Sequence, residues 1–326
     1  MSDQTSDSQQ PKLNMFGRMA SHTEFSIFMG LLILFVVMSV ASPFFLKPTN
    51  IFNVLSQISR YSIISVGMSL VIITGGIDLS VGYVVGLSAC CAAWLTTCAK
   101  LPWPIVLILV LLLGLVIGLT NGLLVTKVGL VPFIVTLATG KVVSGCTLLL
   151  TNGMPISFHS PLAWLGSGYI GSVPVCVVIM FIVIIVGSIF AQRTLTGRNI
   201  YAIGNNSRAA MLSGIHVDKL KCLVYVISGM LSALCGIIVA GNLYSSDASL
   251  GIGYETDVIA AVVIGGVSMS GGEGTIWGSL IGAAIMGILK NAFVLLGVSA
   301  YWQSIVIGIV IIAAVTLDKV RTKKRV

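Results

Sequence analysis

The sequence contains very little charge for its length. Only 9% of its 326 residues are Asp, Glu, Lys or Arg, and just 10 are acidic. Hydrophobic residues make up 56% of the chain, and the mean hydropathy is +1.06. An ordinary soluble domain carries about 25% charged residues, which cover its surface. The shortage of charge therefore excludes a typical water-soluble protein.

Motifs for metal binding, cofactor binding and catalysis are also missing. The seven cysteines lie in or at the ends of apolar segments, without the paired CxxC spacing of a zinc site. The nearest fragment to a phosphate-binding GxxxxGK[ST] loop, Gly140-Lys141, lacks the upstream glycine and the following hydroxyl. His22, His159 and His216 lie outside the apolar segments, so no nucleophile and base meet at membrane depth. We predict no catalytic residue, no cofactor and no metal.

The chain is instead a succession of apolar segments, and crossing a bilayer takes about 20 such residues. About ten segments qualify, although the eighth is short. They cover residues 25–46, 54–74, 81–99, 104–125, 130–150, 174–192, 222–241, 257–269, 275–296 and 301–317. They lack the strict alternation of barrel strands, so helices are expected. The predicted fold is all-α: a polytopic bundle of about ten transmembrane helices.

Lys and Arg are distributed unevenly among the connections between these segments. Positively charged short loops stay in the cytoplasm. Placing the amino end inside leaves only Lys47 and Lys100 outside, so both termini are predicted to be cytoplasmic. The predicted parts are an N-terminal segment 1–24, a single transmembrane domain 25–318 and a basic tail 319–326. Because the basic residues are scattered among membrane loops, no nucleic-acid partner is predicted.

Charged residues at membrane depth need an explanation, because each costs about 2.5–3.5 kcal/mol on insertion scales. We expect Arg60, Lys141 and Lys290 to lie near span ends or to extend toward the headgroups. A basic group is the expected partner of Asp78.

Two glycine-rich breaks interrupt the apolar pattern, GGIDLSVG at 75–82 and GGEGTIWG at 271–278. Each joins two helices through Gly-Gly and an acidic residue. Glycine permits positive φ, and the acidic and hydroxyl side chains can bond free amides at the next helix start. Tight capped turns and gating hinges both remain open as interpretations. The turn or hinge candidates are Gly75, Gly76, Asp78, Ser80, Gly82, Gly271, Gly272, Glu273 and Gly274.

The connection 193–215, after the sixth apolar segment, does not have the composition of a linker. Asn206 or Ser207 can cap a short helix that runs through Ser213, with Gly214 at its carboxyl end. Such a helix presents small and apolar residues beside an arginine outside the bilayer. This arrangement is typical of a docking element, so a cytoplasmic partner is expected.

Three long motifs together resemble the permease subunits of ribose-type carbohydrate ABC importers. They are GGIDLSVG (75–82), TGRNIYAIGNNSRAAMLSGI (196–215) and GYETDVIAAVVIGGVSMSGGEG (253–274), the last continuing into LGVS (296–299). The resemblance spans nearly the whole chain. It implies a multi-pass permease of the bacterial inner membrane for a ribose-like or allose-like pentose or hexose. A separate ATPase subunit would hydrolyse ATP, and a periplasmic sugar-binding protein would deliver the sugar.

The resemblance also implies two permease copies, expected to be a homodimer, and a coupling loop at 193–221 whose helix enters a groove on the ATPase. The coupling residues that it implies are Gly197, Arg198, Gly204, Asn205, Arg208, Ala209, Ala210, Met211, Leu212 and Gly214. The translocation path would lie between the two copies. Its candidates, which can equally bond across helices, are Ser65, Ser69, Asn121, Thr136 and Thr139.

Other interpretations remain open. A secondary transporter or facilitator for a small polar solute would need no ATPase, but the docking-like loop and the lack of an ion relay argue against it. On the outer side, Asp247, Glu255 and Asp257 would either meet basic residues of a binding protein or form a solvated acidic loop.

Overall fold

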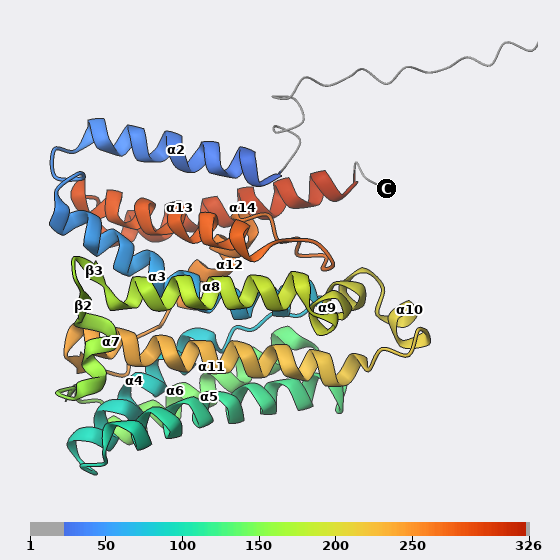
Figure 1. The fold of residues 1–326 in the computed structure, drawn as a ribbon, viewed down its shortest axis with the longest axis horizontal. Helices are drawn as coiled ribbons and strands as arrows, with labels where there is room; N and C mark the ends of the chain where they lie inside the picture. Colours follow the sequence, from blue (N-terminus) through green and yellow to red (C-terminus); the bar gives the residue numbers. More distant parts are fainter. Residues whose placement is uncertain (1–22, 324–326) are drawn as a thin grey trace, which may run out of the picture.

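The computed structural model describes residues 23–323, and in this range the chain forms a bundle of long helices (Figure 1). The long helices are α2 (Thr23–Ala41), α3 (Pro48–Ile73), α4 (Val81–Thr97), α5 (Trp103–Thr126), α6 (Pro132–Thr151), α8 (Val175–Arg193), α11 (Val217–Leu243), α13 (Ile276–Leu295) and α14 (Ala300–Lys323). The shorter helices are η1 (Pro161–Ala163), α7 (Trp164–Ser167), α9 (Leu195–Asn205), α10 (Ser207–Leu212) and α12 (Tyr254–Ile264).

Each predicted apolar segment coincides with a helix, which confirms a helical membrane protein. Within the described part, α3, α5, α6, α8, α11 and α13 are long and apolar enough to cross a bilayer. The apolar parts of α2, α4 and α14 are shorter. The α12 helix has 11 residues, or about 16 Å at 1.5 Å per residue, which is roughly half a span.

The ends of the predicted parts differ from the structure or fall outside it. Most of the N-terminal segment 1–24 and the last residues of the tail 319–326 lie outside the described residues. The α14 helix continues to Lys323, so the basic tail begins inside a helix. The start of α2 and the end of α14 lie at the same end of the bundle as α9 and α10 (Figure 1).

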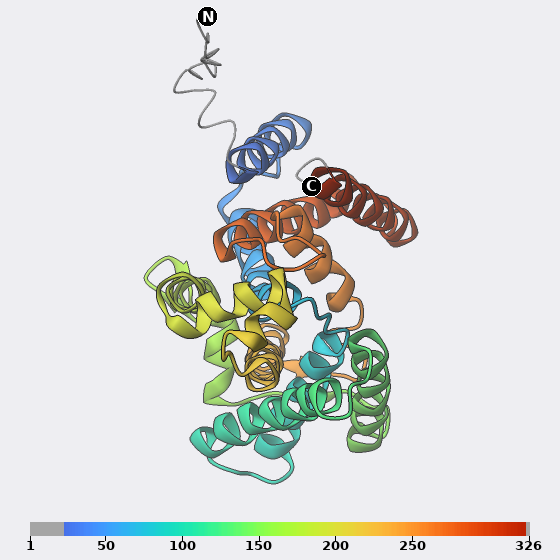
Figure 2. The same ribbon diagram turned by 90° about the vertical axis from the view of Figure 1, so that its right-hand side faces the viewer.

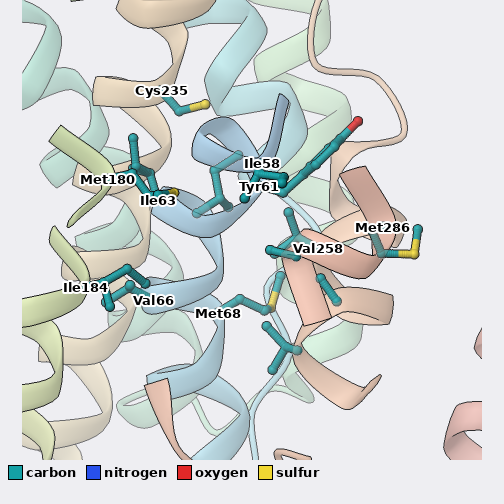
Figure 3. Packing of buried hydrophobic residues seen from close by; sticks show 14 of the residues in the cluster. Ile58, Tyr61, Ile63, Val66, Met68, Met180, Ile184, Cys235, Val258 and Met286 are labelled. Carbon is teal, nitrogen blue, oxygen red and sulfur yellow. The ribbon is translucent and has the colours of Figure 1, made fainter. Parts of the chain in front are cut away.

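The α3 helix forms the centre of the bundle, with 83% of its most apolar window buried. It is surrounded because α8, α11, α12 and α13 all pack against it. Figure 3 shows Ile63 and Val66 of α3 beside Met180 and Ile184 of α8. A membrane helix buried on all sides can carry polar side chains that lipid would not tolerate. This accounts for the serines among the apolar residues of α3.

Close backbone contact joins α5 to α11. A Cβ on Gly114 or Gly118 would collide with the backbone of α11, and a Cβ on Gly229 would collide with the backbone of α5. In the sequence, Gly114, Gly118 and Gly122 recur every four residues, and small residues at this spacing let helices approach closely in lipid.

Two short β-ladders lie at the opposite end of the bundle from α9 and α10. Strand β1 (Ile156–Ser157) pairs antiparallel with β4 (Ser245–Ser246), and β2 (Tyr169–Ile170) pairs with β3 (Val173–Pro174). The all-α prediction did not include them. The β1–β4 pair holds the connection after α6 against the connection after α11. It therefore positions the start of the segment that leads to α12.

Candidate coupling site

The predicted short capped helix is present as α10. The Asn206 side chain accepts a hydrogen bond from the Ala209 amide at 3.0 Å, which satisfies a free donor at the helix start. Gly214 follows the helix with φ +83°, the left-handed conformation that commonly ends helices. The Ser213 hydroxyl donates to the Ala209 carbonyl at 3.0 Å.

The α10 helix exposes a mixed apolar and basic surface. The exposed fraction is 60% for Met211 and 85% for Leu212, and Arg208 and Ala209 are exposed as well. Only Ala210 is buried, against the start of α11. Large apolar side chains exposed beyond the ends of the membrane helices are typical of a protein contact.

A second helix, α9, was not predicted. The Thr194 side chain accepts a hydrogen bond from the Gly197 amide at 2.9 Å and so caps its start. Ile200 and Ile203 are buried on one side of the helix. Their three-residue spacing after a threonine was the available sequence signal. The glycine at 197 packs directly on the last carbonyls of α8, where a Cβ would not fit.

The end of α9 touches the second glycine-rich break and the last residue of α3, two positions before the first break. At Gly204, a Cβ would collide with the Ile73 carbonyl and with the backbone of Gly272. The Gly272 amide in turn donates to the Ile73 carbonyl at 2.9 Å. The Tyr201 hydroxyl donates to the Gly274 carbonyl at 2.9 Å. We call this contact of α9 with the end of α3 and the second break the junction. Through it, a displaced α9 pushes directly on the second break and on the residue that leads into the first.

Burial keeps the hydroxyl of Tyr201 protonated, so that it can donate a hydrogen bond. Desolvation raises the pKa of Tyr201 above its usual value, so the hydroxyl keeps its proton near neutral pH. Its hydrogen bond to the Gly274 carbonyl therefore holds throughout the physiological range.

The second break is a left-handed turn that leads into α13. Gly271, Gly272 and Gly274 have positive φ, which glycine adopts without steric cost. The Thr275 side chain accepts from the Gly278 amide at 2.9 Å and caps α13. Glu273, the acidic residue of this break, is exposed.

The first break is built around a buried carboxylate. Asp78 is 1% exposed. One of its oxygens accepts from the amide and hydroxyl of Ser80 at 3.0 and 2.6 Å, and the other accepts from the Ser228 hydroxyl of α11 at 2.8 Å. The expected basic partner was therefore wrong, because hydroxyl and amide donors supply the hydrogen bonds that a buried carboxylate needs.

The remaining glycines of the first break differ in conformation. Gly75 has φ +78° and forms the turn itself. Gly76 and Gly82 are not left-handed, and they permit close contact instead. A Cβ on Gly76 would meet the Tyr225 hydroxyl at 2.6 Å, and one on Gly82 would meet the carboxylate of Glu255.

Three of the five candidate path residues form hydrogen bonds within or between helices in this conformation. Ser69 shares a hydrogen bond with Ser279 of α13 at 2.7 Å, and Asn121 donates to Ser80 at 2.9 Å. Thr136 donates to the Pro132 carbonyl at 2.9 Å, and its hydroxyl lies 3.3 Å from the Ile77 carbonyl. Ser65 is buried and Thr139 half-buried. Their role in a path stays a prediction.

For three other charged residues the structure shows partners or positions that the sequence did not predict. Asp257 does not lie in a solvated outer loop: it is in the first turn of α12, 4% exposed, and forms an ion pair with Lys290 of α13. The Lys290 ammonium also lies 5.2 Å from the centre of the Tyr61 ring. It is five residues from the end of α13, near a span end as expected. Lys141 is at the centre of α6 and not near its ends.

The comparisons with known proteins agree with this arrangement. The family model described as branched-chain amino acid transport system / permease component matches residues 50–315. The ribose import permease protein of Bacillus subtilis (strain 168) is 44% identical over 295 residues, which cover 90% of this chain and 91% of that protein. The ribose import permease protein of Haemophilus influenzae is 44% identical over 303 residues, covering 91% of this chain and 94% of that one.

A more distant relative transports a different sugar. The galactose/methyl galactoside import permease protein of Escherichia coli (strain K12) is 36% identical over 321 residues, covering 93% of this chain and 96% of that protein. No solved structure gives a significant match. By the extent of these matches, the chain belongs to the family of transport-system permease components, as a multi-pass membrane protein that is a transport subunit and not an enzyme.

Proposed function

We propose that this chain is the membrane permease of an ATP-driven importer for a monosaccharide, ribose or a similar pentose or hexose, in the bacterial inner membrane. The names of its relatives support the sugar class. The observation that carries the proposal is the exposed surface of α10, connected through α9 to the end of α3 and the second glycine-rich break. A facilitator or secondary transporter would have no use for such a surface.

The partners follow from this assignment. A cytoplasmic ATPase subunit binds α10, a periplasmic sugar-binding protein delivers the sugar, and a second permease copy completes the path as a homodimer. About ten spans with both ends in the cytoplasm agree with the positive-inside rule. The common position of α9, α10, the start of α2 and the end of α14 supports this topology (Figure 1).

The mechanism uses the junction as a mechanical link. Closure of the ATPase pair displaces α10, and the short connection at Asn206 passes the movement to α9. Because α9 contacts the backbone at Ile73 and Gly272, the end of α3 and the turn before α13 move with it. The two breaks then change the angles of the helices that follow them, which opens the path alternately to either side.

Reconstitution tests the proposal directly. The permease, its ATPase and its binding protein are incorporated into proteoliposomes, and uptake of radiolabelled ribose is measured with and without ATP. We expect uptake only with ATP and binding protein, without competition from leucine, which is included because the family description mentions amino acids. Equal ribose uptake by the permease alone, without ATP, would favour the facilitator.

A further inference from the structure

Lys141 occupies a position that lipid would not accept. It is the tenth residue of the 20-residue helix α6, about 15 Å from either end at 1.5 Å per residue. Its side chain is exposed in the single chain, and only 28% of the apolar window of α6 is buried. A lysine at the centre of a spanning helix is costly in lipid and marks a protein interior or a water-filled cavity. The Lys141 side chain is therefore expected to meet protein or water, and not lipid.

An aromatic ring lies beside this ammonium group. The Nζ atom of Lys141 is 5.8 Å from the centre of the Tyr83 ring of α4. The ring packs against Gly140, where a Cβ would lie 2.6 Å from a ring carbon. Glycine at 140 thus makes room for Tyr83 beside the lysine, and Tyr83 itself is half-buried.

The third side chain near Lys141 and Tyr83 is a carboxylate. Lys141 interacts electrostatically with Glu255, in the first turn of α12. One oxygen of Glu255 accepts from the Gly253 amide at 3.3 Å. Among the described residues, its other oxygen, Oε2, is buried and makes no hydrogen bond. This oxygen lies against Gly82, where a Cβ would collide with it, so the packing of α12 on α4 covers it.

The helices that supply Tyr83 and Glu255, α4 and α12, both begin near these two side chains. The α4 helix starts after the first break, and α12 starts after non-helical backbone that packs on α4: a Cβ on Gly82 would collide with the Gly251 carbonyl, and one on Gly86 with the Leu250 carbonyl. Irregular backbone at membrane depth is tolerated where protein covers it or where it lines a water-filled cavity. Interrupted helices meeting near the midplane are a common setting for transported solutes.

Helices α6, α4 and α12, together with α14, form one side of the bundle. The α6 helix contacts α4, α4 contacts α12, and α12 contacts α14. Seen from the α10 end, α12 and α4 lie between α6 and α14 on that side (Figure 2). A second copy facing this side would enclose a space lined by Lys141, Tyr83 and Glu255.

We propose that Lys141, Tyr83 and Glu255 form a contact site for the sugar within the translocation path. The Lys141 ammonium donates a hydrogen bond to a sugar hydroxyl oxygen, and the Tyr83 ring packs on the C–H face of the sugar. Glu255 supplies the charge that balances Lys141. The opposite charges of Lys141 and Glu255 cancel, which suits a neutral solute. This inference rests on the proposed function.

Cysteine accessibility tests the site without relying on uptake. Lys141→Cys and Val142→Cys are made in a variant without the native cysteines, and the complex with its ATPase and binding protein is tested in membranes. Val142 is the matched control, one residue further along and 65% exposed on the apolar surface. The probe is a charged methanethiosulfonate that does not cross membranes.

We expect the Lys141→Cys thiol to react about tenfold faster or more than the Val142→Cys thiol, because a thiolate forms in water and not in lipid. Ribose supplied with binding protein and ATP is expected to slow the reaction. Equal, slow labelling at both positions would overturn the inference, and it is also the outcome expected if a second copy covers Lys141. Failure of the cysteine-free parent to import ribose with ATP would instead overturn the proposed function.

Uptake by Lys141→Met gives a second measurement. We expect ribose uptake to fall about tenfold or more through the lost hydrogen bond to the hydroxyl, and Val142→Met to leave it unchanged. Assembly is checked by mass of the purified complex, and if Lys141→Met does not assemble, the labelling experiment decides. Normal uptake by an assembled Lys141→Met complex would contradict a contact with the sugar.

Discussion

Gly204→Val is expected to reduce sugar uptake strongly while the permease remains inserted and bound to its ATPase. The first atom of any side chain at this position collides with the Ile73 carbonyl and the Gly272 backbone. Backbone atoms cannot move aside as a flexible side chain can, and overpacking costs about 1–3 kcal/mol. This cost is relieved when α9 moves away from Ile73 and Gly272. The movement of α9 is then no longer passed on, so uptake should fall about tenfold or more. ATP hydrolysis, measured in the same proteoliposomes, should continue without transport.

The docking surface itself is not changed by this substitution, since Met211 and Leu212 are exposed on α10. Gly30→Val is the matched control, because a Cβ at Gly30 of α2 meets no atom within 4 Å; it should leave uptake unchanged. Normal uptake by Gly204→Val would show that the junction does not transmit the movement. Loss of the ATPase from the purified complex would show that Gly204 supports docking and not transmission. Ala209→Trp, a bulky change on α10, tests the docking surface by the same assay.

Lys290→Met is expected to destabilise the permease strongly. The Asp257 side chain is 5% exposed and its partner Lys290 is 25% exposed, so removing the lysine leaves a carboxylate buried without its counter-charge. Breaking a buried pair in this way costs about 3–5 kcal/mol. The pair joins α12 to α13, whose packing positions the second break between them. The measurement is the midpoint of thermal unfolding in detergent, together with the yield of folded protein.

The double variant Asp257→Leu/Lys290→Met distinguishes the effect of the ion pair on stability from the effect of packing. Replacing both charges by apolar side chains removes the uncompensated charge, so most of the stability should return. The exposed pair Lys127–Asp218, with side chains 66% and 47% exposed, serves as the control cycle and should show a coupling of at most about 1 kcal/mol. Strictly additive losses in the Asp257 and Lys290 variants would mean that the ion pair contributes nothing.

The sequence predicted those features that depend on local chemistry. A capping side chain and a terminal glycine define α10, and both act within a few residues. Apolar length predicted the helices, since hydrocarbon permits little else. The eighth apolar segment is short, and α12 is a short helix as well. The sequence did not show that α12 follows irregular backbone packed on α4.

Features that depend on contacts between distant helices could not be predicted in this way. Nothing in a single sequence pairs Asp257 with Lys290, 33 residues later in the next helix. The serine that bonds Asp78 from α11 is 150 residues away. Lys141 was expected near a span end or extending toward the headgroups, and its sequence surroundings did not place the Tyr83 ring of α4 beside it. In each case the partner is chosen by packing, and packing was not part of the sequence pattern.

Purification of the tagged chain in mild detergent at near-native expression tests the central claim most directly. We predict that an ATP-hydrolysing subunit co-purifies, and that it is lost when the exposed residues Arg208, Met211 and Leu212 of α10 are replaced by Asp, Ser and Ser. Mass spectrometry and ATPase activity of the eluate measure both results. A chain that purifies alone, and that moves ribose into liposomes without ATP, would contradict the account.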